Sequence, residues 1–233
     1  SMTEILDQSD LTDRAAHLVE AARKAGADAA DTVCVRGVSL SVDMRLGKVE
    51  ETRRAEGDDF TLRAFVGKRS ATVSANVLAD PAELAERAVA MAKAAPEDRF
   101  AGLADPGLLA KSFDDDLDLL DETIPQAAEL TEAALAAEDA MRAVEGVSNS
   151  GGASAGWSLG GMVLATSDGF AGSYLASRFS LSASAIAGTG TAMERDYDYA
   201  MRTHRADLAD PATIGRKAGE RAVRRLNPVS YAT

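Results

Sequence analysis

The sequence predicts an α+β protein with mostly antiparallel sheets and three to four packed helices. Strand-like alternation of apolar and polar residues fills two long stretches, and single amphipathic helices separate them. Short glycine turns join the strand candidates directly, which favours hairpins over parallel crossovers. The predicted organisation is one domain over 1–233 with two lobes, 1–95 and 125–226, joined by an acidic loop at 96–124.

The first predicted element is a helix over 11–25. Its apolar residues fall on one face at helical spacing. Asp10 and Thr12 are candidate caps for its start, and Gly26 ends it.

A β-meander of three or four strands follows the first helix. The pattern predicts a half-buried strand whose buried residues are Val33 and Val35, then Val38, Leu40 and Val42. The break in this alternation at Gly37 predicts a bulge or bend. Turns are predicted at Gly47-Lys48, Gly57-Asp58 and Gly67-Lys68, and the polar stretch 49–56 between the first two is a strand candidate. The next helix begins at Asp80-Pro81, because proline is tolerated in the first turn. Its predicted buried stripe is Leu84, Ala88, Met91 and Ala95.

The stretch 96–124 has no clear periodicity and carries an acidic run from Asp114 to Glu122. Carboxylates in a fixed loop with a turn glycine bind Ca²⁺. That glycine is missing here, and Leu117, Leu119 and Leu120 interrupt the acids. We therefore expect a crossing loop whose leucines are held against the core, and not a metal site.

The last elements are a helix at 125–144, long strands over 147–187, a polar strand over 193–205 and a final helix. Asp168-Gly169 is the predicted turn of the long hairpin. The final helix begins at Asp210-Pro211 and repeats the arrangement at Asp80-Pro81.

Composition limits the classes of partner. The net charge of -12 repels a phosphate backbone, so no nucleic-acid partner is expected. The chain has neither a signal-peptide pattern nor an apolar run long enough to span a membrane, so we expect a cytoplasmic protein without membrane contact. Cys34 is the single cysteine and lies in an apolar run, which predicts a buried structural thiol.

The densest group of functional side chains is the run 194–199, in which Glu194, Arg195, Asp196 and Tyr197 are the candidate substrate-binding residues. One interpretation is ion pairing across a strand. The other is a substrate site, in which an extended peptide binds by main-chain pairing, with Arg195 and Tyr197 on one face and the acids on the other.

The final helix carries a second candidate group, Arg216, Arg221, Arg224 and Arg225. These arginines are either a solvated basic face near a helix C-terminus or a docking surface for an acidic partner.

No catalytic residue or metal ligand is predicted in this chain. His17 and His204 are each without a second histidine at zinc-motif spacing. The glycines between 151 and 161 lead into a strand, whereas a phosphate-binding loop leads into a helix.

The ordered series of segments resembles the N-terminal half of the TldD/PmbA family, metallopeptidase subunits once called modulators of DNA gyrase. The segments are VSLSVDMRLGKVEETRRAEGDDFTLRAFVGKRSATVSAN, AKAAPEDRFAGLAD, SNSGGASAGWSLGGMVLATSDGFAGSYLASRFSLSASAIA, MERDYDYAMRTHRADLADP and IGRKAGERAVRRLNP. The RRLNP ending is similar to the PmbA branch, also called TldE.

The resemblance implies a zinc-dependent assembly in the cytosol that cleaves small or unfolded peptides. In this family the HExxxH zinc motif lies in the second half of TldD-like subunits. Zinc is therefore expected only in the partner subunit or the missing half, and no cofactor is expected in this chain. The expected role is assembly and substrate-chamber surface, in a homodimer or a heterodimer with a TldD-like subunit, inactive alone. The alternatives are a stand-alone peptide-binding or assembly module, or a gyrase-linked regulator.

Overall fold

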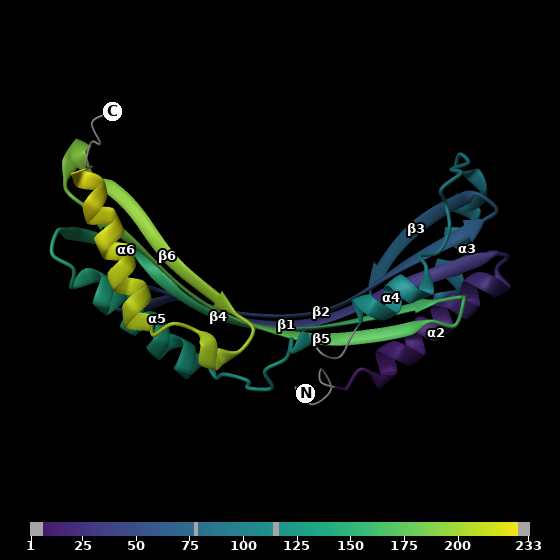
Figure 1. The fold of residues 1–233 in the computed structure, drawn as a ribbon, viewed down its shortest axis with the longest axis horizontal. Coiled ribbons are helices and arrows are strands. Elements are labelled where there is room, and N and C mark those ends of the chain that lie inside the picture. Colours follow the sequence, from purple (N-terminus) through teal and green to yellow (C-terminus); the bar gives the residue numbers. More distant parts are fainter. Residues whose placement is uncertain (1–6, 77–78, 114–116, 228–233) are drawn as a thin grey trace. The chain divides into compact units, whose positions relative to one another are not determined.

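The computed structural model describes residues 7–76, 79–113 and 117–227 (Figure 1). The strands are β1 Ala29–Arg45, β2 Lys48–Val66, β3 Arg69–Asn76, β4 Val147–Thr166, β5 Ala171–Ala187 and β6 Glu194–Arg202. The α-helices are α2 Ser9–Lys24, α3 Pro81–Ala94, α4 Pro106–Ser112, α5 Ala127–Arg142 and α6 Pro211–Leu226. The strands form one sheet in the order β3-β2-β1-β4-β5-β6, and β3 and β6 pair antiparallel with β2 and β5. The predicted α+β class is confirmed.

The chain divides into two compact units, each assembled from three separate segments. Unit 1 comprises Ser1–Val38, Glu56–Asp118 and Gly160–Ala176, and unit 2 comprises Ser39–Ala55, Leu119–Leu159 and Ser177–Thr233. The units interleave along the chain because β1, β2, β4 and β5 contribute to both. The lobes predicted from chain order, 1–95 and 125–226, stay a prediction.

Unit 1 has a core between its strands and the helices α2 and α3. Leu11 and Leu18 of α2, Leu84 of α3 and Leu62 of β2 are all buried in it. Met91, predicted to be buried, is 47% exposed, because α3 buries Val89 and Ala92 instead.

Cys34 is fully buried in the core of unit 1, as predicted. Burial raises the pKa of its thiol to about 11, because the charged thiolate is disfavoured away from water.

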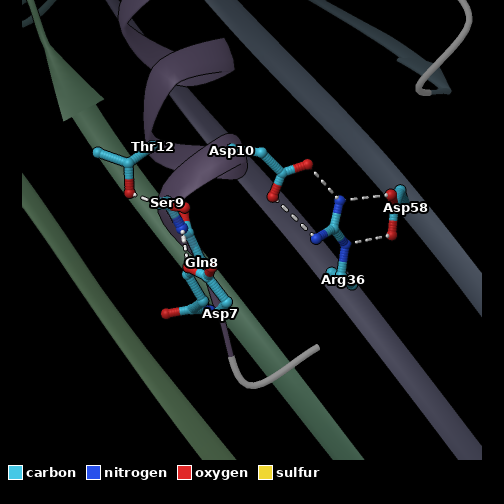
Figure 2. Close-up of polar contacts among 7 residues, drawn as sticks. All are labelled: Asp7, Gln8, Ser9, Asp10, Thr12, Arg36 and Asp58. Atoms are coloured by element: carbon cyan, nitrogen blue, oxygen red, sulfur yellow. Dashed lines mark hydrogen bonds and ion pairs between the residues drawn. The ribbon is translucent and has the colours of Figure 1, made fainter. Parts of the chain in front are cut away.

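The start of α2 is held by an ion-pair network and not by the predicted caps (Figure 2). Gln8 is the N-cap residue and makes no side-chain cap bond. Asp10 instead accepts two hydrogen bonds from Arg36, at 3.0 and 3.1 Å, and Asp58 accepts two more from the same guanidinium. Hydrogen bonding from Arg36 lowers the pKa of the Asp10 carboxyl. The hydroxyl of Thr12 donates to the Gln8 carbonyl oxygen.

Two predicted interruptions of the meander are wrong. β1 continues through Gly37, and its buried face keeps the same alternation from Cys34 to Val38, so Val35 lies on the opposite side at 43% exposure. β2 likewise continues through Gly57 without turning. The first half of β2 is exposed on both faces, and its sequence therefore lacks the alternation that marks a half-buried strand.

The stretch 96–124 contains a short helix that the sequence pattern did not indicate. Asp105 caps α4 by accepting from the backbone nitrogen of Gly107 at 2.7 Å. Leu119 and Leu120 are half-buried, but Leu117 is 55% exposed, so the prediction that it is held against the core is wrong. The acids at 114–116 lie outside the described residues.

Unit 2 contains α5 and α6, which run side by side, with α6 along β6 (Figure 1). Asp210 caps α6 by accepting from the backbone nitrogen of Ala212 at 2.9 Å, as the Asp-Pro pair predicts. Gly215 permits the close approach of the two helices, because a Cβ there would lie 1.9 Å from the Ala137 carbonyl oxygen.

Candidate functional site

The strand β6 carries all four residues of the predicted substrate site and presents them on two different faces. Asp198 and Ala200 are buried on one face. Tyr197 and Tyr199 are 56% and 61% exposed on the other. The predicted separation of the tyrosine and arginine side chains from the acids is therefore present in the structure.

The acidic face of β6 is paired to α6. Arg225 lies 3.4 Å from the Glu194 carboxylate and 3.7 Å from that of Asp196. Arg221 lies 2.8 Å from Asp198, whose side chain is only 11% exposed. The structure thus brings together two groups that the sequence offered as separate sites, and the partners of the acids come from a helix and not from a neighbouring strand.

Two of the four candidate docking arginines are consequently engaged inside unit 2. Arg224 makes a long hydrogen bond to the Glu220 carbonyl oxygen at 3.4 Å, and Arg216 is exposed. Docking of an acidic partner on this helix stays a prediction that rests mainly on Arg216 and Arg224.

The outer edge of β6 is partly capped by side chains. The backbone nitrogen of Tyr197 donates to Asp196 Oδ1 at 2.8 Å, and its carbonyl oxygen accepts from Arg221 Nη1 at 3.1 Å. The Met201 carbonyl oxygen accepts from Arg202 at 2.8 Å. In an antiparallel edge strand, the backbone N–H and C=O groups of alternate residues point away from the neighbouring strand. These side-chain bonds therefore occupy backbone groups that an added strand would use.

The opposite side of β5 and β6 is a surface of small hydroxyls, aromatic rings and two cations, which we name the tyrosine face. It comprises Arg195, Tyr197, Tyr199 and Met201 of β6, and Arg178, Ser180, Ser182 and Ser184 of β5. The rings of Tyr197 and Tyr199 stack with their centroids 6.2 Å apart. Tyr197 lies directly opposite Ser184, and Tyr199 opposite Ser182.

Glycines of β4 keep the neighbouring part of this surface flat. A Cβ at Gly151 would lie 2.7 Å from the Ser184 hydroxyl, and one at Gly156 would lie 2.8 Å from that of Ser180. The serines of β5 therefore lean over the glycines, and no bulky side chain rises between them.

Sequence reasoning missed Glu138, which is fully buried on α5. Its carboxylate accepts hydrogen bonds from the backbone nitrogens of Leu46 and Gly47, at 2.9 and 2.7 Å, and from the Ser150 hydroxyl at 2.7 Å. Leu46 and Gly47 form the β1–β2 turn, and both have positive φ. The position of Glu138 on the apolar stripe of α5, between Ala134 and Met141, could have indicated a buried carboxylate.

The histidines do not build a reactive centre. His17 of unit 1 lines a cavity of about 630 Å³ between α2 and α3, beside Leu18 and Phe60. His204 belongs to unit 2. Within the described ranges, no three His, Cys, Asp or Glu side chains are grouped so that they could hold a metal ion.

Two family models match the chain in succession. Residues 30–92 match the first domain of the PmbA/TldA metallopeptidases, and residues 113–226 match their central domain. The chain belongs to the PmbA/TldD family.

Relatives that the chain matches are named for the same family. It is 36% identical over 97% of its length to a metalloprotease PmbA homolog of Haemophilus influenzae, and 30% identical over 88% to metalloprotease PmbA of Escherichia coli O157:H7. It spans about half of each relative, 50% and 46% of their lengths. A crystal structure from Bacteroides thetaiotaomicron, described as a modulator of DNA gyrase, superposes with a TM-score of 0.82 at 25% identity, covering 94% of this chain and 50% of that one.

Across the parts of the chain that the structure describes, we find no helix with the length and apolar character needed to cross a membrane.

Proposed function

We propose that this chain is the N-terminal part of a PmbA-type subunit, which contributes assembly and substrate-chamber surface for the proteolysis of small or unfolded peptides in the cytoplasm. The observation that carries the proposal is the tyrosine face, an exposed surface that can hold a polypeptide but has no reactive group. The matched domains and the metalloprotease names of the relatives support it.

The proposed mode of contact is with the face of the sheet and not with its edge. Asp196 and Arg221 already hold the main-chain groups of Tyr197 at the edge. The exposed rings of Tyr197 and Tyr199 offer apolar area together with hydroxyl groups, a combination that suits transient contact with varied side chains. The serine hydroxyls of β5 can hydrogen-bond to a peptide backbone.

Zinc, which the family implies, does not fit the residues described here. Cys34 is fully buried, and the described part of the chain offers no cluster of three ligand side chains. We therefore propose that the metal is held by a TldD-like partner subunit or by sequence beyond this chain, and we assign no catalytic step to these residues.

The proposed function is tested by two measurements on the 233-residue chain. The first is the fluorescence anisotropy of a labelled unfolded peptide, and the second is size-exclusion chromatography with a TldD-like subunit. We expect the chain to bind the peptide without cleaving it and to co-elute with the subunit.

A double variant, Tyr197→Ser with Tyr199→Ser, should weaken peptide binding. Met91→Ser, which removes a similarly exposed apolar side chain from α3, should not. Absence of both peptide binding and co-elution would overturn the proposed function. Peptide binding without co-elution would favour the stand-alone binding module.

A further inference from the structure

We propose that the tyrosine face selects acidic, extended polypeptide segments, with Arg178 and Arg195 binding side-chain carboxylates at its two ends. This inference rests on the proposed function and deepens it, because it names the chemical class of the segment that the surface holds.

The first support is the way β6 separates its charges. Glu194, Asp196 and Asp198 all face α6, where Arg221 and Arg225 neutralise them. Arg178 and Arg195, the two arginines of the tyrosine face, have no ion pair or side-chain hydrogen bond to any residue that the structure describes. In a chain with a net charge of -12, the tyrosine face therefore carries two cations, and the acids of β6 all lie on the opposite face of the strand.

An acid on this side of the sheet in unit 2 lies on β1, and its carboxylate is hydrogen-bonded to β4. Asp43 of β1 accepts a hydrogen bond from the Ser154 hydroxyl at 2.6 Å. The negative charge of Asp43 is therefore two strands away from β5 in the sheet.

The second support is the spacing of the cations. Arg195 lies opposite Ile186 in the β5–β6 register, and Arg178 is eight residues before Ile186 on β5. At about 3.4 Å per residue, the two guanidinium-bearing positions are roughly 27 Å apart along the strands. An extended peptide with carboxylates eight residues apart spans the same distance, and its central side chains lie over Tyr197 and Tyr199.

The surface chemistry favours a polypeptide over a single-stranded nucleic acid. Exposed aromatic rings beside arginine also suit base stacking. A nucleic acid, however, carries a phosphate at every nucleotide and is repelled by the net charge of the chain. Two isolated cations separated by uncharged serines and tyrosines match a few carboxylates better than a continuous row of phosphates.

The experiment compares two nonapeptides by fluorescence anisotropy against the 233-residue chain. The acidic probe is fluorescein-Glu-Ser-Leu-Ala-Ala-Ala-Phe-Ser-Glu-amide, in which both Glu and the apolar Leu and Phe share one face of the extended chain, and the neutral probe has Gln in place of both Glu. Variants are Arg178→Gln, Arg195→Gln and the double substitution. Arg202→Gln is the matched control, because it removes the same charge from β6 outside the tyrosine face.

We expect the acidic probe to bind more tightly than the neutral probe, with a preference that decreases as salt is added. Each single variant should lose about fivefold in affinity for the acidic probe, the effect of one exposed ion pair. The double variant should bind the two probes equally, and Arg202→Gln should keep the preference. Because the substituted arginines are exposed, all variants should keep the unfolding midpoint of the parent chain.

Equal binding of both probes by the parent chain would overturn this inference and leave the proposed function standing. So would a preference that survives the double substitution, or tighter binding of the oligonucleotide dT15 than of the acidic probe. Absence of binding by every peptide would count against the proposed peptide surface as well.

Discussion

Replacement of Glu138 tests whether α5 holds the β1–β2 turn through a single buried carboxylate. Three hydrogen bonds end on this side chain, two of them from the backbone of Leu46 and Gly47. A hydrogen bond to a charged group contributes about 1.5–3 kcal/mol, and a buried donor left without a partner costs about 1–3 kcal/mol. Leu46 also has a φ of 52°, a conformation that costs a non-glycine residue about 1–2 kcal/mol.

The expected cost depends on how much of the carboxylate is removed. Glu138→Gln keeps the volume and one acceptor oxygen but turns an NH₂ group towards the donors, so we expect a loss of about 2 kcal/mol in the free energy of unfolding. Glu138→Ala removes every acceptor and leaves a cavity, so we expect a loss of about 4 kcal/mol. The contributions are not fully additive, since the three bonds share one side chain.

Urea unfolding measures the total effect, and amide hydrogen exchange locates it. The amides of Leu46 and Gly47 should lose protection in Glu138→Gln. Glu132→Gln makes the same change at an exposed position of α5 and should stay within about 0.5 kcal/mol of the parent chain. If Glu138→Gln were as stable as this control, or if exchange at the turn were unchanged, the assigned role of the carboxylate would be wrong.

Three further perturbations test the packing and electrostatics of the units. Arg36→Gln should cost about 2 kcal/mol at pH 7 by urea unfolding. Because Arg36 lowers the pKa of Asp10, its contribution is present above the ordinary aspartate pKa of about 4 and is lost as the pH falls through the lowered value, so the deficit of the variant should shrink near pH 2. A deficit that is constant with pH would contradict this pairing. Gly215→Ala should lower the free energy of unfolding by about 2 kcal/mol although alanine has the better helix propensity, because its Cβ meets a carbonyl oxygen of α5. Gly160→Ala is the control, because its Cβ has nothing within 4 Å. Equal stability of the two variants would refute the close helix contact. Cys34, buried and with a pKa of about 11, should react with a disulfide reagent at pH 8 only after unfolding in urea, and rapid labelling of the folded chain would show that it is accessible.

Sequence periodicity predicted the helices and strands that bury one face and expose the other. It gave no reliable boundaries where a strand is exposed on both faces. The helices at α2, α3, α5 and α6 and the hairpin of β4 and β5 follow the predicted ranges closely. The polar strand predicted at 49–56 is the first half of β2, but the turn predicted after it at Gly57 is wrong, because the strand continues to Val66. The predicted break at Gly37 was wrong because Val33 and Val35 were assigned to the buried face in place of Cys34.

The candidate site was found in the right strand but with incomplete roles. The sequence separated Arg195 and Tyr197 from the acids of β6, since side chains alternate along a strand. It could not indicate that Arg225 of α6 would pair with Glu194 and Asp196, because nothing in a strand pattern specifies which helix covers it. Arg178 was overlooked because it joins the tyrosine face only through the register of β5 with β6.

The sequence by itself determined the order of helices and hairpins, the Asp-Pro starts of α3 and α6, and the family resemblance. These properties depend on neighbouring residues or on the linear order of segments, which the chain carries directly. The tertiary structure alone decided that the acids of β6 are neutralised, that Glu138 supports a turn, and that cations and tyrosines share an exposed face. Each of these depends on groups far apart in the chain, whose meeting is set by helix packing and strand register and not by local periodicity.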